Sequence, residues 1–502
     1  MSTRQRPNIL WYCTDQQRSD TIHALGNSHI HTPVLDQLIE NGVGFTQAYC
    51  QTPICTPSRA TFLTGRYPAT HHVHRNGNAV FPEHEVLVTK LLADAGYDCG
   101  LVGKLHLAGS EGKIEPRAND GYRMYGWSHH PYPDIEGNLY TEWLKNEKGV
   151  NPVELYSKLE GSYGVGVPTE LHQTTWCSNV AIQFISEQRD ADQPWLLSMN
   201  PFAPHPSFHP PQEYLDRYTP EEIPFPLFQE HDIERQKAFA GIDQQTIHAV
   251  NPQQYSPEND RNNPDLPRDQ LASIPPSSYD ARLMKACYYA EIELVNDQLG
   301  RVIDVLRDTG QLDNTIIIFM SDHGELLGDH GLLFKGCRFF EALAHVPLII
   351  SGPGFIRGVH SDALVELVDI APTLLEAAGL DVPYYMQGKS LLPLLTGKTV
   401  SDYHKPHVFC EYNDAMGPGT MDTLNHTYEA SHGTMYFDGR YKLVVYHGHT
   451  VGELYDLKAD PGEFNNLWDH VDYKELKAEL LLKHLDAFAA TSSAGIKRVK
   501  EY

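Results

Sequence analysis

The feature that most constrains the fold is a series of short apolar runs that alternate with helical segments. Two runs, at residues 8–13 and 315–320, end directly at polar residues, as buried strands of a parallel sheet do when they lead into a functional loop. Residues 99–102 and 195–199 form further apolar runs, each preceded by a helical segment. This alternation predicts an α/β fold with a large, mostly parallel sheet sandwiched by helices.

The end of the chain follows a different pattern. A chain of 502 residues is too long for one small core, so a large domain with a smaller one is expected. We predict a larger α/β domain at residues 1–400 and a smaller C-terminal α+β domain at 401–502. The smaller one should contain an antiparallel sheet plus a final helix at residues 473–490. Residues 201–280, rich in Pro and Asn, are expected to form a long irregular excursion over the surface.

The charge balance limits the possible partners. The formal net charge of −26 argues against nucleic acid, because phosphate contacts need clustered Lys and Arg. No apolar run has the length needed to cross a bilayer, and the N-terminus lacks the pattern of a signal peptide. We therefore expect no membrane partner and a cytoplasmic location. The eight cysteines form no close CxxC pair, so neither a zinc site nor a disulfide framework is indicated.

Acidic and polar residues follow two of the predicted strands. Asp15 and Gln16 follow the first run, and Asp322 and His323 follow the run at 315–320. In open parallel sheets, ligands bind at the carboxyl ends of the strands. Four oxygen or nitrogen donors at two strand ends suit a hard divalent cation. The alternative is that Asp15 caps a turn and Asp322 pairs with an arginine; two acidic strand ends together favour the metal site.

Cationic side chains are expected to gather at the same edge. Lys104 and His106 follow the run at 99–102, two residues apart and hence on one side of an extended segment. His205 follows the run at 195–199, and Lys335 lies in a later loop. Each alone would suit a solvated strand end or loop. Together they predict a small cationic pocket that holds an anion within an acidic protein.

The chain contains CTPSRATFLTGR at residues 55–66. The pattern predicts a helix with Pro57 at its first position and Gly65 at its end. Cys55 would then lie at a helix N-terminus, where free N–H groups and the helix dipole favour a sulfate or phosphate group. Arg59 would add a forked cationic donor. The alternative is a buried structural cysteine beside an ordinary helix start.

This run resembles the signature of the sulfatase family, and the resemblance covers most of the chain. It implies that a formylglycine-generating enzyme oxidises Cys55 to formylglycine, whose hydrate is the nucleophile. It also implies that Asp15, Gln16, Asp322 and His323 bind one divalent metal, with the formylglycine oxygen completing the shell. These Asp-Gln and Asp-His pairs resemble the choline sulfatase and phosphonate monoester hydrolase branches of the alkaline phosphatase superfamily. Calcium is the expected metal, and the imidazole ligand keeps manganese open.

The resemblance implies further roles at matching positions. Lys104 would hold a sulfate oxygen, and His106 would orient or deprotonate the hydrated aldehyde. His205 and Lys335 would stand beside the leaving-group oxygen, where either can act as general acid. Asn76 would lie near the substrate.

These residues predict a sulfatase that hydrolyses a sulfate monoester to an alcohol or phenol and inorganic sulfate. One alternative is a phosphonate monoester hydrolase or phosphodiesterase with the same nucleophile; Lys104 and His106 favour the sulfatase, because the phosphonate hydrolases resemble one another in having Tyr and Thr there. A second alternative is an inactive, ligand-binding relative. The substrate is expected to be a small anionic sulfate ester, with sulfated sugars preferred over aryl or choline sulfates. Candidate pocket residues are Trp127, Tyr132, Trp143 and the segment 426–432.

Overall fold

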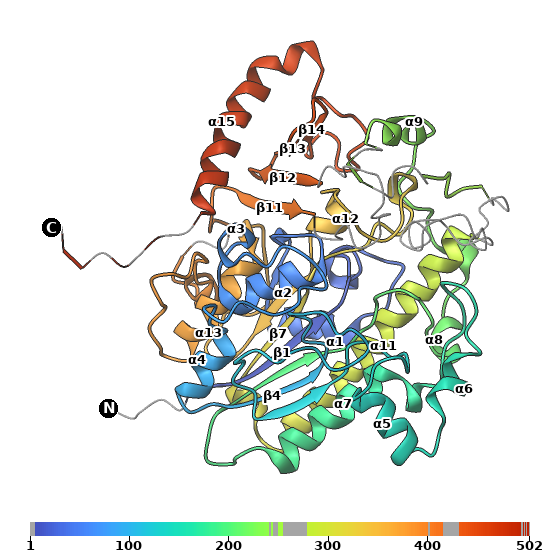
Figure 1. Cartoon of the computed structure of the whole chain (residues 1–502), viewed down its shortest axis with the longest axis vertical. Coiled ribbons are helices and arrows are strands. Elements are labelled where there is room, and N and C mark those ends of the chain that lie inside the picture. The colour runs from blue at the N-terminus through green and yellow to red at the C-terminus, as the bar shows by residue number, and fades with distance from the viewer. Residues whose placement is uncertain are drawn as a thin grey trace.

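The computed structural model has an eight-stranded sheet at its centre (Figure 1). Neighbouring strands are parallel except at β8, which runs antiparallel to both β7 and β2. The strands, in spatial order, are β5 (Met124–Trp127), β4 (Asp98–Gly103), β6 (Trp195–Asn200), β1 (Asn8–Thr14), β7 (Thr315–Ser321), β8 (Leu348–Ser351), β2 (Gly42–Phe45) and β9 (Val359–Ser361). The structure describes residues 6–239, 242–243, 249–254, 279–399, 402–414, 431–492, 495, 497, 499 and 500.

Both faces of the sheet are buried. In β1, Ile9 and Trp11 join one apolar cluster while Leu10 and Tyr12 join the other, because successive side chains of a strand point to opposite faces. The predicted α/β sandwich is therefore confirmed (Figure 1). The first face is covered by α2 (Cys55–Thr64), α4 (Val88–Asp94) and α13 (Ile370–Ala377), and the second by α1 (Pro33–Glu40), α7 (Gln173–Gln183) and α11 (Ala281–Asp308).

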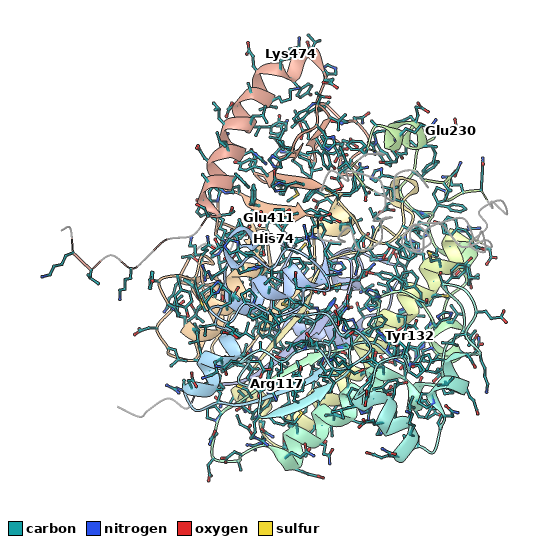
Figure 2. All side chains as sticks on the ribbon, viewed as in Figure 1. His74, Arg117, Tyr132, Glu230, Glu411 and Lys474 are labelled. Atoms are coloured by element: carbon teal, nitrogen blue, oxygen red, sulfur yellow. The ribbon has the colours of Figure 1, made fainter. Side chains whose placement is uncertain are left out.

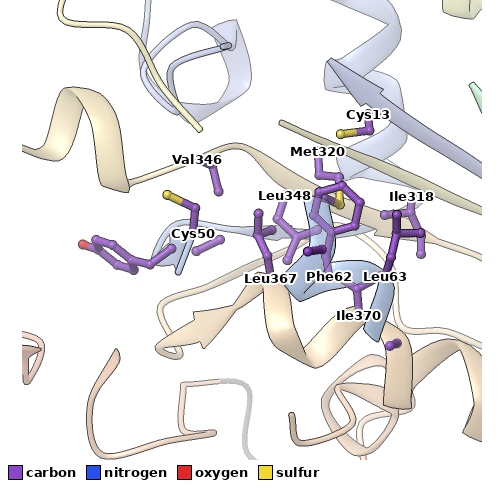
Figure 3. Packing of buried hydrophobic residues seen from close by; sticks show 14 of the residues in the cluster. Cys13, Cys50, Phe62, Leu63, Ile318, Met320, Val346, Leu348, Leu367 and Ile370 are labelled. Carbon is purple, nitrogen blue, oxygen red and sulfur yellow. The ribbon is translucent and has the colours of Figure 1, made fainter. Parts of the chain in front are cut away.

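Helix α2 is fixed over the centre of the sheet by its apolar side chains. Figure 3 shows Phe62 and Leu63 of α2 packed among Ile318 and Met320 of β7. Burying each such side chain stabilises the fold by about 1.5–3 kcal/mol. This packing places the first residue of α2 next to the carboxyl end of β7.

The C-terminal part has the predicted antiparallel sheet and final helix. Leu443 and Leu454 of the sheet pack against Leu480 and Ala487 of the helix. The division at residue 400 stays a prediction. The elements are β11 (Val408–Asn413), β12 (His432–Phe437), β13 (Tyr441–Tyr446), β14 (Gly452–Asp456) and α15 (Lys474–Ala490).

Shorter elements complete the chain. The described part of the predicted excursion at 201–280 contains two short α-helices and a 3-10 helix (Pro220–Glu222) joined by irregular segments, and residues 240–241, 244–248 and 255–278 lie outside the described residues. None of the described helices combines the length and apolar character needed to cross a membrane. Among the described residues, the remaining α-helices and strands are β3 (Ala48–Tyr49), α3 (Pro68–His71), α5 (Leu139–Asn146), α6 (Pro152–Tyr156), α8 (Gln212–Leu215), α9 (His231–Lys237), α12 (Glu341–Ala344), β10 (Val365–Glu366) and α14 (Leu392–Leu395).

Glu411 of β11 is buried where the C-terminal sheet meets α3 (Figure 2). Its Oε1 accepts a hydrogen bond from the backbone N–H of Ala69 at 2.5 Å. Burial raises the pKa of Glu411 to about 7, and the Ala69 N–H only partly opposes this shift. The folded protein therefore holds the carboxyl proton more tightly than the unfolded chain does.

We expect Glu411→Gln to reduce the pH dependence of stability. The folded pKa is raised, so the contribution of Glu411 to stability is present below its unfolded pKa of 4.5 and is lost as the pH rises through about 7. The parent should lose on the order of 3 kcal/mol of unfolding free energy through this group between about pH 4.5 and pH 8. Urea denaturation across this range measures the loss. An equal loss in the variant would contradict the assignment.

Candidate active site

The residues predicted at the two strand ends converge. Asp15 follows β1, and Asp322 and His323 follow β7; these strands are paired in parallel with Thr14 beside Ser321, so the residues that follow meet at one edge. The possible ligand atoms of Asp15, Cys55, Asp322 and His323 all lie within 4.8 Å of one another, and all four residues are buried.

Cys55 occupies the centre of this cluster. Its Sγ lies 3.1 Å from Nε2 of His323 and 3.6 Å from Oδ1 of Asp15. The predicted helix start is wrong by two residues: α2 begins at Cys55, and Pro57 is its third residue. Proline is tolerated there because the N–H groups of a first helical turn have no partner within the helix. Cys55 therefore lies at the helix N-terminus, as predicted.

Arg59 and Lys104 neutralise the two carboxylates. Nε of Arg59 donates to Oδ2 of Asp322 at 2.9 Å, and its guanidinium lies 3.6 Å from Oδ2 of Asp15, which also bonds to the Lys104 ammonium. Burial alone would raise the pKa of Asp15, but Lys104, His205 and Arg59 together hold it well below its ordinary value. Asp322 thus pairs with an arginine, which was the sequence-based alternative to a metal site. It also belongs to the cluster of possible metal ligands.

Lys335 brings a positive charge into the middle of the cluster. Its Nζ lies 2.9 Å from Sγ of Cys55, 2.8 Å from Oε1 of Gln16 and 3.3 Å from Nε2 of His323. It also lies 3.1 Å from Nε2 of His205. The groups around this ammonium are a thiol, an amide and two imidazoles, and the carboxylates of Asp15 and Asp322 belong to the same cluster. This set of oxygen and nitrogen donors around a cationic group fits a divalent cation.

The same charges act on the thiol. Burial and Asp15 raise the pKa of Cys55, but Lys104, Lys335 and His323 outweigh them and lower it below its ordinary value. Burial and then Lys335 hold the pKa of His205 well below the ordinary value of an imidazole. The pocket therefore favours a negative charge at the position of the Cys55 side chain.

The segment that carries Lys104 and His106 differs from its prediction. Strand β4 ends at Gly103, and His106 has φ of 59°, so the segment turns instead of staying extended. Both side chains are buried. Burial, followed by Lys104 and His129, holds the pKa of His106 well below its ordinary value. A neutral imidazole is the form that a base requires.

Asn76 contacts the helix that carries Cys55. Its Oδ1 accepts a hydrogen bond from the backbone N–H of Thr56 at 3.0 Å. This satisfies one of the N–H groups that a first helical turn leaves open. Contact between Asn76 and a substrate remains a prediction.

Comparison with known proteins decides the family. The family model described as Sulfatase matches residues 7–380, well over half of the 502 residues. The chain belongs to the sulfatase family. The predicted enzyme class, a hydrolase of sulfuric esters, is thereby confirmed. A second family model, described as N-sulphoglucosamine sulphohydrolase, C-terminal, matches residues 328–490.

Full-length relatives support the assignment. An arylsulfatase of Clostridium perfringens is 29% identical over 517 residues, covering 99% of this chain and 98% of the relative. An N-acetylglucosamine-6-O-sulfatase of Bacteroides thetaiotaomicron is 29% identical over 528 residues, covering 95% and 85%. The crystal structure of a phosphonate monoester hydrolase of Agrobacterium radiobacter has a TM-score of 0.79 at 27% identity and covers 99% and 98%. The sulfatase family implies formylglycine and a divalent metal, and the described residues contain a candidate metal site.

Sequence reasoning assigned no role to Glu325 of this sulfatase. One carboxylate oxygen of Glu325 accepts from Nε2 of Gln16, and the other accepts from the N–H groups of Leu327 at 2.9 Å and Phe334 at 2.5 Å. Glu325 therefore fixes the Gln16 amide with its oxygen facing Lys335. The position of Glu325 directly after Asp322-His323-Gly324 was the sequence feature that could have indicated this role.

The aromatic residues predicted to line the substrate pocket have different surroundings in the structure. Trp127 is buried and donates to Glu115 at 2.8 Å, and Trp143 stacks on Tyr140 with ring centroids 6.0 Å apart. Tyr132 lines a small cavity that His205 also lines. Residues 426–430 lie outside the described residues. Tyr132 is thus the described candidate that shares a cavity with a predicted catalytic residue.

Proposed function

We propose that this sulfatase acts through the oxidised form of Cys55. The observation that carries the proposal is the position of this side chain at the start of α2, between Lys335 and His323. Its Sγ stands in for the hydroxyl oxygens of a formylglycine hydrate. The hydrate supplies two hydroxyl groups, one to attack sulfur and one whose deprotonation later releases inorganic sulfate. A formylglycine-generating enzyme is the proposed maturation partner.

We assign the metal site to Asp15, Gln16, Asp322, His323 and the oxidised Cys55. Calcium is the proposed ion because most donors are carboxylate and amide oxygens, and the His323 imidazole makes manganese the second candidate. A bound cation would lower the pKa of the nucleophilic hydroxyl and neutralise charge on the transferred group.

The other cationic residues would bind and orient the sulfate group. Arg59 holds Asp322 and Asp15 in place and adds positive charge beside the nucleophile. In this proposal Lys104 binds a sulfate oxygen, and His106 orients or deprotonates the nucleophile. These contacts would offset the negative field of the chain and attract an anionic ester.

We assign proton transfer to the leaving group to His205 and Lys335. Nζ of Lys335 lies 3.1 Å from Nε2 of His205, so the two can share a proton. The other ring nitrogen, Nδ1, lies 2.8 Å from the carbonyl oxygen of Pro206, which fixes the orientation of the imidazole. An alcohol needs this proton more than a nitrophenolate does, because the nitrophenolate leaves without it.

His205→Ala is therefore expected to lower kcat by on the order of 10²-fold for an alkyl sulfate and by less than about tenfold for 4-nitrophenyl sulfate. Steady-state kinetics on both esters measures the difference. His209→Ala is the matched control, because His209 lines the same cavity and its Nε2 lies 3.2 Å from the carbonyl oxygen of Glu160. An equal loss on both esters would remove His205 from proton transfer.

A sulfated sugar is the proposed substrate. The relative described as an N-acetylglucosamine-6-O-sulfatase supports it, and the phosphonate monoester hydrolase structure keeps the alternative in view. The test compares kcat/KM for N-acetylglucosamine 6-sulfate, 4-nitrophenyl sulfate and a phenyl phosphonate monoester. We expect both sulfates to exceed the phosphonate. A strong preference for the phosphonate would favour the alternative, and a formylglycine-bearing protein inactive on all three would favour a ligand-binding role.

A further inference from the structure

Glu115 has a buried carboxylate that binds the loop after β4. It is 1% exposed. Its Oε1 accepts from the backbone N–H of His106 at 2.8 Å and from Nε1 of Trp127 at 2.8 Å. Its Oε2 accepts from the backbone N–H groups of Leu107 at 2.7 Å and Ala108 at 3.0 Å. Three consecutive N–H groups thus converge on one carboxylate.

This convergence explains the shape of the loop. His106 has φ of 59°, a left-handed conformation that residues other than glycine rarely adopt. A concave run of N–H groups binds an anion, and hydrogen bonds to a charged acceptor are stronger than those between neutral groups. The Glu115 carboxylate therefore holds a backbone conformation that the sequence of the loop does not itself favour.

The ring of His106 depends on that backbone. Its Nδ1 is buried and makes no hydrogen bond within the described part of the chain. The ring packs edge-on against His129, with centroids 4.4 Å apart. Two residues before His106, the carbonyl oxygen of Lys104 anchors the start of the loop. It accepts hydrogen bonds from Arg59 at 3.1 Å and from Asn200 at 2.9 Å. Glu115 thus provides the anchor at His106 itself.

We propose that Glu115 is a positioning residue for the reaction, acting by fixing the His106 imidazole through the backbone N–H groups of residues 106–108. This inference rests on the role proposed above for His106. Trp127 contributes to it, because its indole N–H donates to Oε1 of Glu115, the same oxygen that accepts from the backbone N–H of His106.

The test is Glu115→Gln. The amide NH₂ of the new side chain cannot accept a hydrogen bond and would face backbone N–H donors. We expect kcat for 4-nitrophenyl sulfate to fall by about 30- to 100-fold, with KM changed by less than about threefold. Asp120→Asn is the matched control. Asp120 is a buried acid of the same segment whose carboxylate binds Arg117 and the N–H of Tyr122, away from residues 106–108. It should keep kcat within about threefold of the parent at a comparable loss in Tm.

A double-mutant cycle separates positioning from general destabilisation. In a His106→Ala background, Glu115→Gln should change kcat by less than about threefold, because the group that Glu115 positions is gone. A full additional loss in that background, or a parent-like kcat in the single variant, would overturn the proposal. So would a loss that Asp120→Asn reproduces.

A crystal structure of the Glu115→Gln variant gives a readout that needs no activity. We expect residue 106 to leave the left-handed region and its ring to move away from His129. An unchanged His106 would refute the positioning role even in an active enzyme. A parent protein without activity on any sulfate ester would count against the proposed function, while the displaced ring would still support the structural link from Glu115 to His106.

Discussion

Cys55→Ala is expected to lower kcat/KM for a sulfate ester by on the order of 10⁴-fold or more, the largest effect of any single change in this sulfatase. The reason is positional: Sγ of Cys55 lies 2.9 Å from Nζ of Lys335 and 3.1 Å from Nε2 of His323, at the position proposed for the nucleophile. Steady-state kinetics on 4-nitrophenyl sulfate measures the loss. The variant should keep the parent Tm within a few degrees, because alanine suits the start of a helix.

A control variant and a chemical test accompany this prediction. Cys50→Ala removes another buried thiol, five residues earlier, whose Sγ lies 3.8 Å from the carbonyl oxygen of Leu343, and it should leave kcat/KM near the parent value. Mass spectrometry of the peptide carrying Cys55 should show one sulfur and two hydrogens replaced by one oxygen. A fully active protein with only free thiol at Cys55 would contradict the formylglycine assignment.

Local pattern was enough to predict the sheet and the edge at which the candidate ligands gather. Residues 9–13 and 316–320 are apolar throughout because both faces of their strands are buried, and this pattern distinguishes a central parallel strand from an edge strand. The parallel arrangement then places Asp15 and Asp322 at one edge of the sheet, and the pairing of β1 with β7 brings them together. Part of the site therefore follows from strand order alone.

Contacts that depend on loop conformation could not be predicted in this way. His106 has positive φ because Glu115, nine residues later, gathers three N–H groups, and nothing in the spacing of these residues indicates that contact. Asn76 faces Thr56 through a loop of irregular conformation. Such hydrogen bonds are set by tertiary packing, which overrides local propensity.

Asp322→Asn is expected to remove the bound metal and to lower kcat/KM by on the order of 10³-fold, which corresponds to about 4 kcal/mol of lost transition-state stabilisation. Its Oδ1 accepts from the N–H groups of Gln16 and His323, and its Oδ2 accepts from Arg59 at 2.9 Å. An amide NH₂ at either position would face these donors and would supply no anionic ligand. Metal analysis of the purified protein, set beside kinetics, checks both effects.

Asp329→Asn is the matched control for Asp322→Asn, because Asp329 is also buried and ion-paired with an arginine, Arg18 at 2.8 Å, but lies outside the ligand cluster. It should retain the metal. Chelation of the parent should abolish activity, and the ion that restores it at the lower concentration decides between calcium and manganese. An Asp322→Asn protein that binds metal with parent affinity would place the cation elsewhere. Asp15 and Asp322, whose carboxylates pair with Arg59 and Lys104, would then serve the stability of the fold and not metal binding. The presence of these buried charges beside Cys55 would then need an explanation other than a metal site.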